Sequence, residues 1–211
     1  MIKIPAVWTY KTTGAFSVEA MDLCNVAREN KANVIEGAAS VEQEMVTLIA
    51  HYFYGEKGDR VGLYDEFKEM ILETDWCSFA AKKKMIAHIL EKRSVLNEKL
   101  RKKYLDLLQD TMTYRNAFAH GEISADQKSA RLTYFQNSRK EVELTDEFLR
   151  KVEVTLSNAF HETRELCCKI GAVKMVPGVE FEKAETKVAA EAPNVPDGNV
   201  PIFIKPKQTV E

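Results

Sequence analysis

Residues 31–54 read KANVIEGAASVEQEMVTLIAHYFY, and this stretch decides the fold. Apolar side chains recur in it at alternating spacings of four and three residues, a period near 3.5. The repeating positions are Val34, Ala38, Val41, Met45, Leu48 and Tyr52. Such a seam predicts a long amphipathic helix that packs against another helix, either within the chain or from a second subunit.

A second seam of the same kind lies further along the chain. Its positions are Leu149, Val152, Leu156, Ala159, Thr163, Cys167 and Ile170. Thr145 is a good N-cap for this helix, since acidic residues follow it directly, and Gly171 predicts its end.

Further helices are predicted around and between the two seams. A short helix follows Ser17, and another spans residues 65–75. Ser78 is predicted to cap a helix through Leu90, and Ser94 a longer one that ends at His120. The order of these segments predicts an all-α protein built as an up-down helical bundle.

One segment departs from the helical pattern. Residues 132–135 and 141–144 alternate as short strands do, and residues 136–138 join them, so a β-hairpin appended to the bundle is predicted. The helical domain is then expected over residues 31–171, after an N-terminal arm and short helix over residues 1–30. Residues 172–211 hold five of the six prolines, and they predict an irregular C-terminal tail.

Composition excludes several classes of protein. No apolar run approaches the roughly 20 residues that a membrane-spanning helix needs, and the N-terminus lacks the pattern of a signal peptide. The four cysteines show no paired metal-ligand spacing, which favours a reduced, cytoplasmic protein. Neither a Gly-rich phosphate loop nor a cluster of metal-ligating residues is visible, so neither a cofactor nor a metal ion is expected.

The net charge of −2 hides a basic block at residues 82–103. This block holds nine Lys and Arg against two Glu, a local charge of +7. Its candidate RNA-binding residues are Lys82, Lys83, Lys84, Arg101, Lys102 and Lys103. A positive patch suits the phosphates of RNA, whereas the alternative interpretation is a solvated helical face.

The candidate functional residues lie in YRNAFAHG, residues 114–121. Arg115 supplies a permanent planar cation that suits phosphate oxygens, and His120 suits proton transfer near neutral pH. Asn116 and His120 share a helix face, but Arg115 lies about 140° from His120 around an ideal helix. Both can reach one substrate only if the helix frays near Gly121 or a second copy completes the site. The alternative is that these side chains cap helix carbonyls.

This Arg-Asn-x3-His-Gly stretch, late in a helical domain, resembles the Arg-x4–6-His signature of the HEPN superfamily. The resemblance covers roughly residues 30–171 through the order of the helices. It implies an up-down helical bundle, a homodimer whose two motifs face each other, and metal-independent endoribonuclease activity. Many members act in toxin–antitoxin, phage-defence or RNA-processing systems, so RNA and an antitoxin are the implied partners.

For this chain, the resemblance implies that Arg115, Asn116 and His120 are catalytic. His120 would act as general acid or base, Arg115 would stabilise phosphorane-like charge, and Asn116 would orient His120 or bind phosphate. Some HEPN toxins carry a modifiable Tyr two residues after the His, where this chain has Ile123. Regulation by tyrosine modification is therefore not expected.

Two other functions compete with the nuclease. One is a non-catalytic RNA- or protein-binding module that uses Arg115 only to hold phosphate. The other is a dimerisation domain in which the two apolar seams mediate assembly. The remaining histidines, His51, His88 and His161, are interpreted as structural or surface residues.

Overall fold

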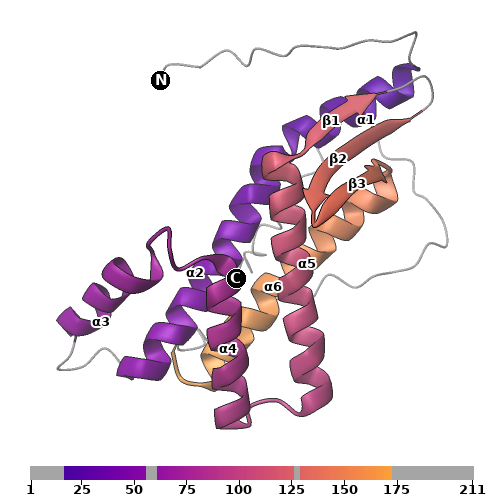
Figure 1. Ribbon diagram of the computed structural model, residues 1–211. Coiled ribbons are helices and arrows are strands. Elements are labelled where there is room, and N and C mark those ends of the chain that lie inside the picture. The colour runs from indigo at the N-terminus through magenta and orange to yellow at the C-terminus, as the bar shows by residue number, and fades with distance from the viewer. Residues whose placement is uncertain (1–16, 56–60, 126–128, 173–211) are drawn as a thin grey trace, which may run out of the picture.

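The computed structural model describes residues 17–55, 61–125 and 129–172 (Figure 1). These residues form a mainly helical protein with one small antiparallel sheet. The expected arm at residues 1–16 and the expected tail beyond residue 172 lie outside the described residues. In the part that the structure places, no helix combines the length and apolar character needed to cross a lipid bilayer.

The two predicted seams belong to helices α2 (Lys31–Tyr54) and α6 (Asp146–Lys169), which pack against each other. Their buried positions include Val41, Met45, Leu48, Val152, Ala159 and Cys167. Arg164 on α6 also donates to the Glu44 carboxylate on α2, at 2.8 Å. Each seam therefore finds its partner within the chain. Most of the seam side chains are thereby buried within one chain, which leaves little of either seam exposed for a second copy.

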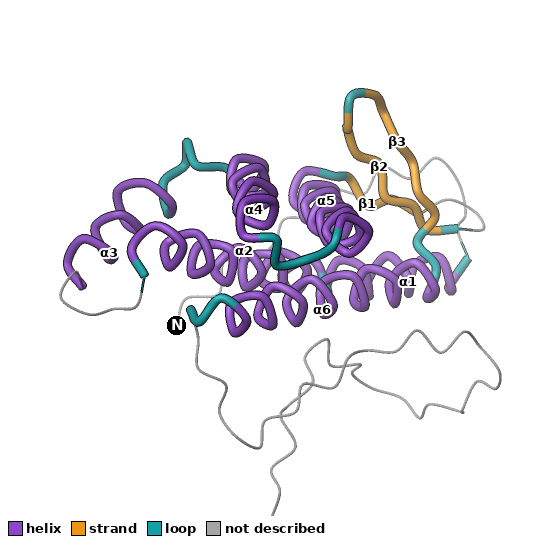
Figure 2. The backbone as a smooth tube through the Cα atoms, turned by 90° about the horizontal axis from the view of Figure 1, so that it is seen from below, coloured by secondary structure: helices purple, strands orange, loops and turns teal. Residues whose placement is uncertain are grey.

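Helices α4 (Phe79–Arg93) and α5 (Glu98–His120) form a hairpin that packs on the α2–α6 pair (Figures 1 and 2). Leu108 and Tyr104 of α5 are fully buried in this interface. The Tyr104 hydroxyl lies 2.9 Å from the Thr163 hydroxyl of α6, so the buried phenol has a hydrogen-bond partner. This contact joins the two layers and anchors the first half of α5.

Three of the predicted helix caps are confirmed. Ser17, Ser78 and Thr145 accept hydrogen bonds from backbone N–H groups in the first turns of α1 (Val18–Glu29), α4 and α6. The predicted cap at Ser94 is wrong. Ser94 adopts the left-handed conformation at the end of α4, and Asn97 caps α5 by accepting from the Leu100 N–H at 2.9 Å.

The helix predicted over residues 65–75 is displaced in the structure. Helix α3 (Val61–Phe67) begins earlier and passes into one π-helical turn, η1 (Lys68–Leu72). This arm projects to one side of the body beside the end of α2 (Figure 1). It is remote from the C-terminal end of α5.

The predicted two-stranded hairpin is part of a three-stranded antiparallel sheet in the order β1-β2-β3. Its strands are β1 (Glu122–Ala125), β2 (Ala130–Gln136) and β3 (Ser138–Glu143). The β2–β3 turn is centred on Asn137, at φ 63°, where the sequence predicts it. Strand β1 was not predicted, because four residues carry too little alternation to identify a strand.

The sheet begins directly after α5, and Gly121 makes the junction possible. A Cβ atom at residue 121 would lie 2.2 Å from the Ala117 carbonyl oxygen and 2.8 Å from Leu132 Cδ1. The backbone φ of −80° is ordinary, so the requirement for glycine here is one of space. The end of α5 and strand β2 therefore approach more closely than any other residue would allow.

We expect Gly121→Ala to lower the free energy of unfolding by about 2 kcal/mol, because the added methyl group meets backbone that cannot move aside. Urea denaturation followed by circular dichroism measures the change. Gly62→Ala is the matched control, since a Cβ at that helical position meets no atom within 4 Å. Equal stability of both variants would show that the junction has room for a side chain.

Candidate functional site

The motif residues Arg115, Asn116 and His120 occupy the last two turns of α5, which stays helical through His120. Gly121 follows in an extended conformation, and its N–H donates to the Ala117 carbonyl at 2.8 Å. The helix therefore does not fray before the histidine. Gly121 is the first residue past the helix, and it leads directly into β1.

Arg115 and Asn116 interact with each other. The Arg115 Nη1 atom donates to the Asn116 Oδ1 atom at 3.0 Å, which draws the guanidinium towards the face that Asn116 occupies. His120 lies one helical turn further on the same face and is exposed, as Asn116 is. A cation, an amide and an imidazole thus gather on one accessible strip, although Arg115 itself starts about 140° from His120.

This strip belongs to a longer stripe of polar side chains along α5. On an ideal helix, residues 18 apart are separated by five full turns and share a face. The stripe, here termed the α5 face, comprises Lys102, Asp106, Gln109, Thr113, Asn116 and His120. It extends for about 27 Å along the helix axis. Helix α5 itself lies between α4 on one side and the β2–β3 hairpin on the other (Figure 2).

Both flanks are joined to the α5 face by hydrogen bonds. On the α4 side, Lys83 Nζ donates to the Gln109 side-chain oxygen at 2.5 Å. On the sheet side, Gln136 donates to the Thr113 hydroxyl at 3.2 Å and accepts from Lys140 Nζ at 3.1 Å. Two lysines therefore border the face at its middle. Neither connection was foreseen, because each joins residues more than 20 positions apart.

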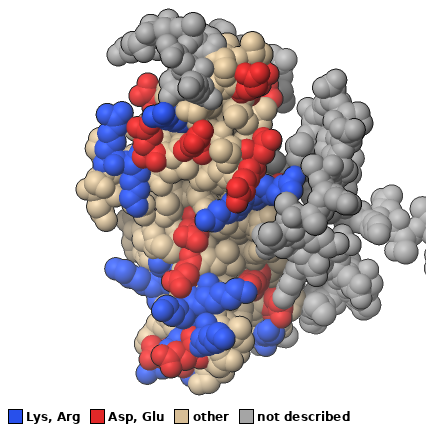
Figure 3. Space-filling model, turned by 90° about the vertical axis from the view of Figure 1, so that its right-hand side faces the viewer, with Lys and Arg blue, Asp and Glu red and all other residues tan. Residues whose placement is uncertain are grey.

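The basic side chains of residues 82–103 differ in how far they are exposed to solvent. Lys82 is buried and paired with Glu42 at 2.5 Å, so its charge is not offered to solvent. Lys84 is exposed on α4, and Arg101 is half-buried. Seen from the side in Figure 3, Lys and Arg side chains gather at the height of the α4–α5 connection, with acidic side chains among them. The structure thus removes Lys82 from the candidate RNA-binding surface.

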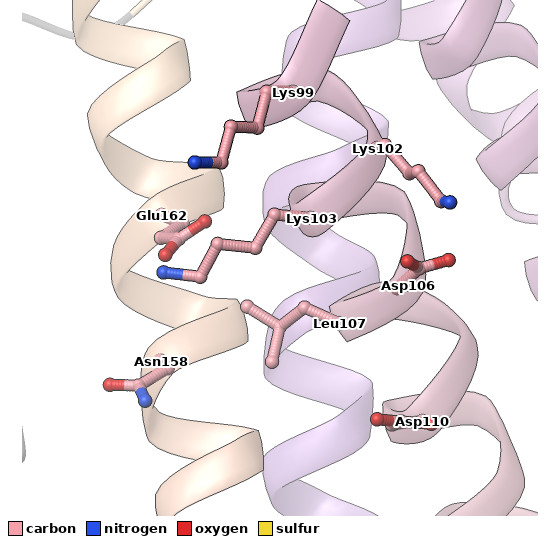
Figure 4. Close-up of a pocket in the computed structure, with 8 residues that line it drawn as sticks. All are labelled: Lys99, Lys102, Lys103, Asp106, Leu107, Asp110, Asn158 and Glu162. Atoms are coloured by element: carbon pink, nitrogen blue, oxygen red, sulfur yellow. The ribbon is translucent and has the colours of Figure 1, made fainter. Parts of the chain in front are cut away.

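Lys102 and Lys103 face opposite sides of α5 (Figure 4). Lys103 and Lys99 point towards α6, where they border a shallow groove of about 440 Å³. The groove is also lined by Lys102, Asp106, Leu107, Asp110, Asn158 and Glu162. Lys102 points away from α6, on the side of the α5 face. Lys102 therefore borders the groove but points its ammonium group away from α6, whereas Lys99 and Lys103 point towards it.

Packing beneath the motif fixes its position. Ala117 and Phe118 are completely buried, and the Tyr114 ring meets Phe148 of α6 edge-on with centroids 5.9 Å apart. Burial raises the pKa of the Tyr114 phenol, and the nearby Asp110 charge adds to this effect. Tyr114 is therefore a neutral packing residue at physiological pH. The alternation of buried and exposed residues leaves Asn116 and His120 on the outside.

The other three histidines have different surroundings. His51 Nε2 lies 3.1 Å from the Ile170 carbonyl oxygen and links the ends of α2 and α6. His161 is half-buried beside the Phe160 ring, whereas His88 is exposed on α4. Among the described residues, no group of three or more His, Cys, Asp or Glu could hold a metal ion. His120 is the histidine that accompanies both an arginine and an amide.

Comparison of the chain with protein-family models, curated proteins and solved structures gives no match.

Proposed function

We propose that the protein is a metal-independent endoribonuclease of the HEPN type. The observation that carries this proposal is the hydrogen-bonded Arg115–Asn116 pair on the same exposed strip as His120. A guanidinium and an imidazole near the same end of one helix can supply charge stabilisation and proton transfer to one phosphodiester. The α5 face adds a surface along which an RNA strand can lie.

The proposed reaction is transesterification. His120 accepts the proton of the ribose 2′-OH, and the 2′-oxygen forms a bond to phosphorus. The bond between phosphorus and the 5′-oxygen breaks, and a protonated imidazole donates its proton to the leaving oxygen. The products are a 2′,3′-cyclic phosphate and a 5′-hydroxyl. Arg115 stabilises the additional negative charge on the phosphoryl oxygens, and Asn116 holds the guanidinium in place.

A homodimer is part of the proposal. Each chain brings one His120 to the motif, whereas the reaction needs a base and an acid. A second copy supplies the second imidazole if the two exposed strips face each other. The resemblance further suggests a toxin or phage-defence role, with an antitoxin or another protein as a partner.

The test is cleavage of a structured RNA by purified protein in EDTA, with identification of the new ends. The proposal expects 2′,3′-cyclic phosphate ends and loss of cleavage in His120→Ala. Products that carry 3′-hydroxyl ends would reject this mechanism. RNA binding without cleavage would favour the alternative, a non-catalytic RNA-binding module.

If RNA binds along the α5 face, its affinity should depend on salt concentration through the lysine on that face. We expect Lys102→Ala to reduce the slope of log affinity against log salt concentration by about 0.7–0.9, since one phosphate contact is lost. Lys103→Ala removes the same charge one residue away, on the α6 side, and should leave the slope nearly unchanged. Fluorescence anisotropy with a labelled RNA measures both slopes. Equal effects of the two substitutions would place the RNA elsewhere.

A further inference from the structure

Phe135, near the end of β2, is exposed to an unusual degree. Its side chain is 81% accessible, the highest value among the exposed large hydrophobic residues of the described chain. Folding gains little from an apolar ring in water, so the core gives no reason for a phenylalanine at this position. The exposed ring is therefore available for contact with another molecule.

The strand that carries Phe135 borders the motif. Strand β2 continues past the segment that pairs with β1. The pairing stops at Thr133, whose partner is Glu122, the first residue of β1 and two residues after His120. Beyond Thr133, the neighbour of β2 on this side is α5 instead of β1, because the Gln136 side chain donates a hydrogen bond to the Thr113 hydroxyl. Phe135 lies between these two fixed positions. Its backbone therefore runs beside the stretch of α5 that carries Asn116 and His120, whereas its side chain projects from the face of the sheet opposite to the one from which Gln136 reaches α5.

Phe135 also belongs to the solvent face of the sheet. Successive residues of a strand point to opposite faces, and the buried Ala130 and Leu132 define the inner face. Arg139 is the cross-strand partner of Phe135 in the β2–β3 register, so the two side chains are neighbours on the outer face. Within the described part of the chain, Arg139 has no ion-pair partner. The next carboxylate on this face, that of Glu141, is paired with Arg131.

We propose that Phe135 and Arg139 form a binding site for an unpaired nucleobase of the RNA substrate. The base stacks on the Phe135 ring, and the Arg139 guanidinium binds the adjoining phosphate. The inference rests on the proposed nuclease and names its substrate class, which is RNA that contains an unpaired nucleotide. A paired base cannot stack here, because its faces are covered by its neighbours in the helix.

The test measures binding separately from cleavage. The probes are a single-stranded RNA with 2′-O-methyl groups, which cannot be cleaved by transesterification, and a fully paired RNA of the same length. We expect Phe135→Ala to weaken single-strand binding by about tenfold or more, while binding of the duplex stays within twofold of the parent. Phe135→Trp should restore single-strand binding, because the larger ring still stacks. Phe53→Ala, at another exposed phenylalanine on the far end of α2, is the control.

The outcomes separate this inference from the proposed function. Cleavage that depends on His120 but is indifferent to Phe135 would overturn the stacking site alone. Single-strand binding that depends on Phe135, without any cleavage, would support the stacking site and overturn the nuclease. The stacking site would also be overturned if Phe135→Ala weakened binding of single-stranded and paired RNA equally. Failure of Phe135→Trp to restore single-strand binding would overturn it too. Binding of neither RNA by the parent protein would overturn both proposals.

Discussion

His120→Ala is expected to lower the rate of RNA cleavage by about 10²- to 10⁴-fold, because the variant loses its general acid and base. The side chain is exposed at the end of α5, so its removal should leave the fold intact. His88→Ala is the matched control, since it removes an equally exposed imidazole from the neighbouring helix. Gel analysis of a labelled RNA in EDTA gives both rates. If the two variants cleave equally fast, His120 is not the proton-transfer residue.

The His120→Ala variant also tests whether cleavage requires two copies of the chain. When parent and His120→Ala chains are mixed and allowed to reassociate, a mixed dimer holds only one intact imidazole. If acid and base come from different chains, activity falls with the square of the parent fraction. A linear fall would instead show that each chain cleaves on its own.

Glu42→Ala is expected to lower the free energy of unfolding by about 3 kcal/mol, the largest loss of stability among the substitutions considered. The Lys82 side chain is only 5% exposed, and its ammonium lies 2.5 Å from the Glu42 carboxylate. Removal of the carboxylate leaves a buried cation without its counter-charge. For a domain of this size, the melting temperature should fall by roughly 6–12 °C. Differential scanning calorimetry at neutral pH measures the change.

The control for this prediction is the double variant Glu42→Ala with Lys82→Met. Methionine keeps most of the buried volume but carries no charge, so the double variant should be more stable than Glu42→Ala alone. If Glu42→Ala alone costs less than about 1 kcal/mol, the lysine can reach water. Lys82 would then return to the set of candidate RNA-binding residues.

The course of the main helices could be predicted because their signals are local. Seam periodicity identified α2 and α6, and the caps Ser17, Ser78 and Thr145 marked where helices begin. The start of α5 was misplaced, since Ser94 and Asn97 are both good caps three residues apart. The choice between them depends on how the α4–α5 connection turns, and a single sequence does not show this.

The candidate site could be predicted as a motif but not as a surface. Arg115, Asn116 and His120 are adjacent in sequence, whereas the flanking bonds from Lys83 and Gln136 join distant segments. The burial of Lys82 could have been predicted, since this residue shares the face of α4 that holds Ile86 and Ile89. Its partner Glu42, 40 residues away, is a tertiary feature. The exposure of Phe135 depends on the sheet register in the same way.

The close junction at Gly121 also affects the entropy of substrate binding. The final turn of a helix usually samples several conformations, and a ligand that orders it loses affinity in proportion to the freedom removed. Here Ala117 and Phe118 are buried beneath the motif, and β1 begins immediately beyond it. The backbone that carries His120 is therefore ordered by folding itself. Interactions with an incoming phosphodiester remain available for the transition state, because none of their free energy is needed to organise the helix end.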